Sequence, residues 1–148
     1  MRDELISNEI IKLFAKEIFR FADFWFDHYY TQGSNASILK AHPEYVNNYR
    51  SRIVMTVTNG LHAVSGGSYS QLDYYNLGKA EAQNGFSEAE ALENRESFET
   101  AMEAFLIKRK AEGDLKASNQ EIAYYLEELK AFHDQIMPFI LQGYKNAQ

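Results

Sequence analysis

Three polar side chains on apolar helical stripes are the strongest candidates for chemistry in this sequence. Arg50 falls between Val46 and Ile53, and a buried guanidinium needs an anion or several acceptors because it cannot lose its charge. His28 ends the apolar stripe of the first predicted helix, and His133 lies within that of the last. In the functional interpretation, Arg50 anchors a ligand carboxylate or an inorganic anion.

The same three side chains also have purely structural interpretations. Arg50 can form a salt bridge with a carboxylate at the edge of the core, or extend its charged end to water. A single histidine in a core is more often a hydrogen-bonded structural residue than a ligand. Either histidine would nevertheless make an inner chamber sensitive to pH near neutrality.

No common enzyme signature is found in the sequence. It has no G-x-S-x-G, no Walker loop, no G-x-G-x-x-G after a strand and no H-E-x-x-H. Its four histidines have no partner at metal-ligand spacing on an apolar face, and there is no cysteine. We expect the acidic run that includes Glu88, Glu96 and Glu99 to be a solvated surface. The sequence therefore predicts neither an enzyme nor a metal site.

Composition narrows the class of protein further. The 148 residues predict a single domain over 1–148, and ten Phe, ten Tyr and one Trp supply a large aromatic interior. A formal charge of −6 without a run of Lys and Arg argues against nucleic-acid binding. No stretch approaches the roughly 18 apolar residues that span a bilayer, and the first residues do not resemble a signal peptide. We expect a cytoplasmic protein without a transmembrane segment.

Helical periodicity and helix-end signals predict the elements that must position these side chains. The predicted helices cover residues 3–30, 43–64, 70–84, 88–112 and 119–145, with a short helical turn at 36–41. Gly85 and Gly113 suit left-handed helix caps, and capping boxes begin at Ser87 and Ser118. Pro138 should kink or break the last helix. Strand signals are poor, so the fold class is all-α with about six helices.

Two stretches of the sequence resemble a known family. Residues 77–87, LGKAEAQNGFS, keep the glycine spacing of the G-x-x-H-x-x-x-G run that closes the haem-binding helix of globin-type sensor domains, with Glu81 at the position of the haem-ligating histidine. The opening ELISNEIIKLFAKEIFRFADFWFDHYY and the chain length resemble haem-less globin-like sensor-domain proteins of spore-forming bacilli. These are plasmid-borne sporulation-inhibitory proteins related to the sensor domain of a sporulation histidine kinase.

This resemblance implies a homodimeric globin-like fold without haem. In place of haem, an apolar tunnel takes a fatty acid, and a polar chamber holds a small anion such as chloride. The implied role is to inhibit sporulation by competing for the signal of the related sensor histidine kinase.

The residue assignments are our own inference. Seven apolar side chains are predicted to line the tunnel: Phe21, Phe24, Trp25, Ile53, Val57, Phe98 and Phe105. The chamber and the head group are assigned to His28, Arg50 and His133. We expect a dimer to use apolar residues outside the main stripes, namely Phe132, Phe139 and Leu141.

Two other functions compete with this one. A true haem globin would need unusual ligation through His28 or His62, since carboxylates such as Glu81 are poor haem ligands. A helical protein–protein interaction module without a ligand would use its aromatic residues only as core.

Overall fold

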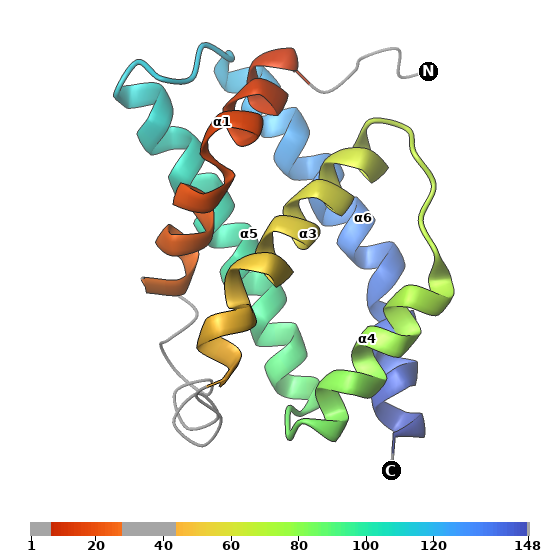
Figure 1. The fold of residues 1–148 in the computed structure, drawn as a ribbon. Helices are drawn as coiled ribbons and strands as arrows, with labels where there is room; N and C mark the ends of the chain where they lie inside the picture. The colour runs from red at the N-terminus through yellow and green to blue at the C-terminus, as the bar shows by residue number, and fades with distance from the viewer. Residues whose placement is uncertain (1–6, 28–43, 148) are drawn as a thin grey trace.

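The computed structural model describes residues 7–27 and 44–147, which are mostly helical (Figure 1). The helices are α1 (Asn8–Trp25), α3 (Glu44–Val64), α4 (Gln71–Gln83), α5 (Glu88–Ala111) and α6 (Asn119–Asn146). The described residues contain no strand, which confirms the all-α class. Five helices are described instead of about six, and the helical turn expected at 36–41 lies outside the described residues.

The ends of the helices follow the local signals of the sequence. At the start of α5, the Ser87 amide donates to Glu90 Oε1 at 3.0 Å, and the Glu90 amide donates to Ser87 Oγ at 3.2 Å. The same reciprocal capping box begins α6 at Ser118. Gly85 and Gly113 have φ of 99° and 84°, a left-handed conformation that glycine adopts without a steric penalty. These predictions are confirmed.

The predicted start of the first helix needs correction, and so does the break that was one of two outcomes predicted at Pro138. Helix α1 begins at Asn8 and not near residue 3, because the Ser7 side chain caps it by accepting from the Glu9 amide at 3.2 Å. Helix α6 continues through Pro138 to Asn146, so of the two outcomes predicted at Pro138, a kink or a break, the break does not occur. Proline removes one backbone hydrogen bond, and the buried apolar face on both sides of Pro138 holds the helix together.

Helix α1 is interrupted at Glu17, whose φ of −128° and ψ of 23° are not helical. The Arg109 guanidinium of α5 binds the Glu17 carboxylate with two nitrogens: Nε donates to Oε2 at 3.1 Å, and Nη2 donates to Oε1. Both side chains are largely buried, with 12% of Arg109 and 10% of Glu17 exposed. This two-pronged ion pair ties the interrupted turn of α1 to α5.

We expect Arg109→Lys to lower the free energy of unfolding by about 1.5 kcal/mol, because an ammonium cannot reproduce the planar fork. Arg20→Lys is the matched control, since Arg20 donates to the same carboxylate but its side chain is 70% exposed. The control should change stability by less than about 0.5 kcal/mol. Urea unfolding of both variants measures the difference, and equal stability would contradict this role of Arg109.

The core is divided into two clusters along α6. The first cluster joins α1, α3, α5 and the first half of α6, and includes Phe14, Phe21 and Tyr125. The second joins the end of α6 to α4 and to the turn before α5. Phe132, expected outside the main stripe, is a buried member of the second cluster, with its ring 5.5 Å from that of Tyr69. The Phe132 ring therefore packs against residues of its own chain, although it was expected at a dimer interface.

Helices α4 and α6 lie side by side with their backbones in contact (Figure 1). A Cβ placed on Gly78 would lie 1.9 Å from the backbone oxygen of Ile140, and one on Gly143 would lie 2.1 Å from that of Tyr75. Each helix therefore presents a glycine at the point where the other approaches. Gly78 is the first glycine of the pattern that resembles the haem-binding helix of globin-type sensor domains. In this structure, its missing side chain allows α4 and α6 to pack closely.

Candidate functional site

The side chains predicted to line a tunnel come together in the first core cluster. Six of the seven are buried members of it, and Phe24 packs partly buried against it. They come from three helices: Phe21 and Trp25 from α1, Ile53 and Val57 from α3, and the remainder of the buried set from α5. These side chains therefore share one packed cluster, and their role as the lining of a tunnel stays a prediction.

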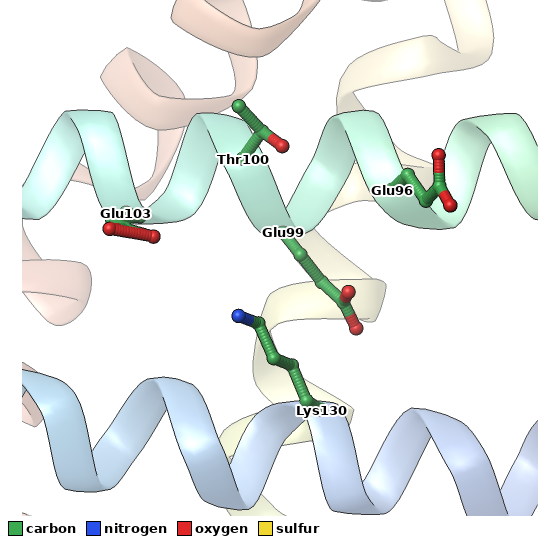
Figure 2. Close-up of a pocket in the computed structure, with 5 residues that line it drawn as sticks. All are labelled: Glu96, Glu99, Thr100, Glu103 and Lys130. Carbon is green, nitrogen blue, oxygen red and sulfur yellow. The ribbon is translucent and has the colours of Figure 1, made fainter.

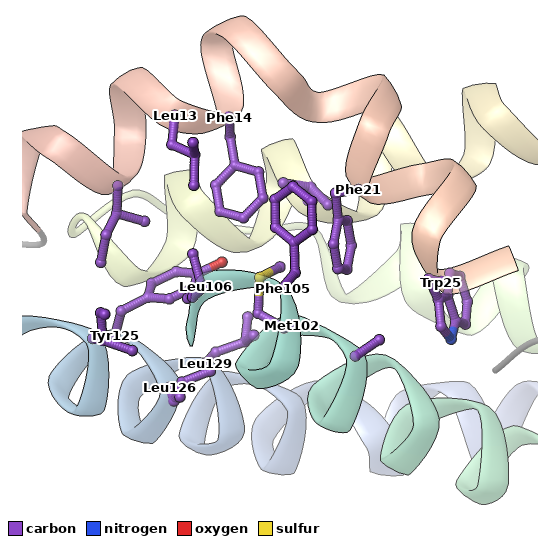
Figure 3. Packing of buried hydrophobic residues seen from close by; sticks show 14 of the residues in the cluster. Leu13, Phe14, Phe21, Trp25, Met102, Phe105, Leu106, Tyr125, Leu126 and Leu129 are labelled. Carbon is purple, nitrogen blue, oxygen red and sulfur yellow. The ribbon is translucent and has the colours of Figure 1, made fainter. Parts of the chain in front are cut away.

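These aromatic rings pack directly on one another (Figure 3). The Phe21 ring lies 5.5 Å from Phe98 and 5.3 Å from Phe105, both edge to face, and Trp25 lies 5.3 Å from Phe98. Edge-to-face aromatic pairs stabilise the fold by more than the burial of their apolar area alone. The Trp25 indole also donates to Ser97 Oγ at 3.0 Å, which fixes its orientation.

The hydroxyl of Tyr125 is a second polar group within the first core cluster. Tyr125 is fully buried, and its hydroxyl has no hydrogen-bond partner in the part of the chain that the structure describes. Figure 3 shows the hydroxyl pointing into the cluster. Burial raises the pKa of the Tyr125 hydroxyl, so the group remains a proton donor. A buried donor without an acceptor is costly, and a bound water or ligand oxygen would remove that cost.

A polar cluster borders the aromatic rings between α5 and α6. His133 Nδ1 lies 2.6 Å from Glu99 Oε2, and Arg95 Nε donates to the same oxygen at 3.0 Å. Arg95 Nη2 also donates to Asp134 Oδ1 at 2.7 Å. The His133 ring lies 5.8 Å from the ring of Phe98, a predicted tunnel residue. This cluster connects the aromatic core to the surface.

Glu99 differs from the solvated acidic surface that the sequence predicted. Its side chain is only 11% exposed, whereas Glu88, Glu93 and Glu96 are exposed. Burial by itself raises the pKa of Glu99, but hydrogen bonds from His133 and Arg95 outweigh it and lower the pKa below its ordinary value of 4.5. The carboxylate is therefore a structural anion that joins the two helices.

The lowered pKa of Glu99 predicts a pH-dependent contribution to stability. The contribution should be full above the ordinary pKa of 4.5 and should be lost as pH falls through the lower pKa of the folded protein. We expect Glu99→Gln to cost about 1.5 kcal/mol at neutral pH and progressively less below pH 4.5. Urea titrations at several pH values measure it. The exposed neighbour Glu103→Gln is the control, and an equal loss in both variants would contradict the assignment.

A pocket of about 200 Å³ opens beside this cluster, between α5 and α6 (Figure 2). Its lining includes three carboxylates and one ammonium: Glu96, Glu99, Thr100, Glu103 and Lys130. The excess of negative charge opposes a fatty-acid carboxylate or chloride there. No group of three or more His, Asp or Glu side chains in the described residues has an arrangement that could hold a metal ion.

Of the predicted polar chamber, the structure describes only His133. The side chains of His28 and Arg50 lie outside the described residues. His133 is buried as expected, and its carboxylate partner comes from α5. Sequence reasoning missed Arg95, although its spacing of four residues from Glu99 on one helix was a usable signal for the pair.

Neither Glu81 nor His62 lies in the aromatic cluster. The Glu81 carboxylate accepts a hydrogen bond from the Tyr144 hydroxyl at 3.4 Å, across the contact between α4 and α6. The exposed His62 ring lies in the last turn of α3 against Gly67, where a Cβ would be 2.2 Å from His62 Nε2.

The chain was also compared with known proteins. No family model, no curated protein and no solved structure matches it. Among the described helices, none has the combination of length and apolar character needed to cross a membrane.

Proposed function

We infer that this protein is a haem-less, globin-like signal-binding protein whose aromatic interior takes a fatty acid. The observation that carries the proposal is that six of the predicted tunnel side chains, from α1, α3 and α5, are buried in one cluster with Tyr125, whose hydroxyl has no hydrogen-bond partner among the described residues. An apolar interior with one convergent polar group is the usual composition of a small-molecule site.

The energetics of such binding are favourable. Each methylene of the acyl chain contributes about 0.8 kcal/mol on burial, so about ten methylenes offset the cost of association and of separating packed rings. The Tyr125 hydroxyl would donate to a carboxylate oxygen of the ligand, which gives that buried donor its acceptor. Arg50 and His28 remain proposed head-group partners, and the proposed small anion, such as chloride, would bind beside them.

The proposed role follows from sequestration of the signal. A homodimer in the cytoplasm would bind the fatty acid that a related sensor histidine kinase requires, and would thereby inhibit sporulation. Glu81 stands where a haem globin would have its iron-ligating histidine. This substitution supports the proposal that the protein binds a different apolar molecule in place of haem.

Mass spectrometry of an organic extract of the purified protein tests the proposal. We expect a fatty acid at close to one equivalent per chain, and a lower content in Tyr125→Phe, which loses the donor but keeps the ring. Repeated absence of lipid, together with no affinity for added palmitate, would overturn it. An absorbance scan after reconstitution tests the haem alternative, in which a Soret band with stoichiometric iron would indicate ligation through His28 or His62.

A ligand-free interaction module is the second candidate. The close edge-to-face packing of Phe21, Phe98 and Phe105 favours it, because these rings fill the space between α1 and α5. Under this alternative the extract contains no lipid and added palmitate leaves the melting temperature unchanged. Under the first proposal palmitate raises it.

A further inference from the structure

The turn between α4 and α5 holds an exposed Asn-Gly pair, Asn84 and Gly85. Asn84 ends α4 with φ of −91° and ψ of 5°, and Gly85 follows in the left-handed conformation, with φ of 99°. The side-chain amide of Asn84 has no hydrogen bond to the described residues. Asparagine loses its side-chain nitrogen most readily before glycine, because no Cβ hinders attack by the glycine nitrogen.

A second Asn-Gly pair, Asn59 and Gly60, lies within α3, more than one turn before the end of that helix. Asn59 is exposed, as Asn84 is, so the two pairs share their dipeptide chemistry and their access to water. Gly60, however, is buried, and a Cβ on it would lie 3.1 Å from Leu129 Cδ1 of α6. The two pairs therefore differ in how much structure surrounds the glycine nitrogen.

Two backbone hydrogen bonds close the turn after α4. The Gly85 amide donates to the Ala82 oxygen at 3.1 Å. The Phe86 amide donates to the Glu81 oxygen, also at 3.1 Å. This arrangement is the Schellman motif, and Phe86, which follows its glycine, is buried in the second core cluster. The turn thereby ties the end of α4 to the core.

Reaction of either pair requires local opening of the backbone. The glycine nitrogen must reach the side-chain carbonyl carbon of the asparagine, and the asparagine ψ of a helix holds these atoms apart. At Asn84, only the turn that ends α4 has to open. At Asn59, helical turns on both sides and the contact with α6 must be lost. Opening costs little at a helix end and much more in a packed helix, so the reactive geometry is populated mainly at Asn84.

We propose that Asn84 is a site of spontaneous modification, at which the folded chain converts asparagine to isoaspartate and aspartate while Asn59 is protected. The Gly85 nitrogen attacks Asn84 Cγ and gives up its proton. The Cγ–Nδ2 bond breaks, and Nδ2 leaves with that proton as ammonia, which closes a five-membered succinimide. Water then opens the ring, at the main-chain carbonyl to give isoaspartate or at Cγ to give aspartate. The reaction involves no fatty acid, so it is independent of the proposed function.

Both products alter the turn that holds Phe86. Isoaspartate adds one carbon atom to the main chain, which moves the Gly85 and Phe86 amides away from their acceptors. Either product also adds a negative charge at the carboxyl end of α4, where the helix carbonyl groups already carry a partial negative charge. Modification is therefore expected to loosen the end of α4.

Ageing of the full chain near neutral pH, followed by tryptic digestion and mass spectrometry, tests the site. Trypsin places the two pairs in separate peptides, residues 53–79 and 80–95. Conversion raises the mass of the peptide because a hydroxyl replaces the amide NH2 group. We expect Asn84 to convert roughly tenfold faster than Asn59, since a slow reaction follows the population of the open form. Equal rates, or an unchanged Asn84 when a synthetic peptide of residues 80–95 has converted, would overturn the proposal.

Guanidinium chloride provides the control for the fold, because it unfolds the chain and leaves both dipeptides intact. In the unfolded chain, Asn59 and Asn84 should convert at similar rates. A preference for Asn84 that persists in denaturant would show that flanking sequence causes it, and would overturn the structural assignment.

Asn84→Gln tests the consequence for α4, because glutamine keeps a neutral amide but cannot close the five-membered ring. Wild type and Asn84→Gln are aged together and compared by amide hydrogen exchange, with the freshly purified proteins as the reference. We expect exchange in α4 to become faster in aged wild type and to stay unchanged in aged Asn84→Gln. Equal exchange in the two aged proteins would contradict the loosening of α4.

Discussion

Gly78→Ala is expected to lower the free energy of unfolding by about 3 kcal/mol, because the new methyl group would overlap the backbone of α6. Its Cβ would lie 1.9 Å from the Ile140 oxygen and 2.7 Å from the Ile140 carbonyl carbon. Neither atom can rotate away, so α4 and α6 must separate. Alanine is favoured over glycine within a helix by about 1 kcal/mol, which offsets only part of this loss. Gly143→Ala should have a similar effect, since its Cβ would lie 2.1 Å from the Tyr75 oxygen.

Gly60→Ala is the matched control for both variants. Gly60 is also a buried helical glycine, but its nearest neighbour is the Leu129 Cδ1 atom at 3.1 Å, the end of a flexible side chain. We expect its stability to stay within about 1 kcal/mol of wild type. Urea unfolding measures all three variants. Wild-type stability of Gly78→Ala and Gly143→Ala would show that the two backbones are not in contact.

Phe21→Ala is expected to cost about 4 kcal/mol. Phe21 is fully buried, and its ring contacts Phe14 at 5.8 Å in addition to Phe98 and Phe105. Removing the ring forfeits its transfer free energy and leaves a cavity that three neighbouring rings line.

Phe19→Ala controls for the loss of a phenyl ring from the same helix. Phe19 is 60% exposed, so we expect a change of less than about 0.5 kcal/mol. Thermal unfolding of delipidated protein measures both variants. Equal melting temperatures would contradict the packing around Phe21. Addition of palmitate to Phe21→Ala then probes the cavity, since a ligand that fills it should recover part of the lost stability.

The helices were largely predictable because their signals are local. A capping box needs residues only three positions apart, as at Ser87 and Glu90, and a left-handed cap needs one glycine, as at Gly85. The aromatic set was also predictable, since one buried face per helix leaves few places for Phe21 or Phe105. The misplaced start of α1 has the same local origin, because Ser7 was an unrecognised cap.

The polar contacts of the site were less predictable. Glu99 belonged to a run of acidic residues, and only the docking of α6 on α5 buries it against His133, 34 positions later in the chain. The Tyr125 hydroxyl, which has no hydrogen-bond partner among the described residues, likewise has no signature in its own segment. There, a helix face of Ile, Tyr and Leu indicates only that the face is buried in the core. Such environments depend on which helices meet.

The sequence by itself determined that the described chain is helical, where most of its helix caps lie and which faces are apolar. These properties follow from hydrogen bonds and periodicity within four residues along the chain. Only the tertiary structure decided that Arg109 binds Glu17, 92 positions away, and that Gly78 meets the backbone of α6. Contacts of this kind depend on the angle and depth at which helices pack. Those are fixed by the combined shape of many side chains, so no single segment encodes them.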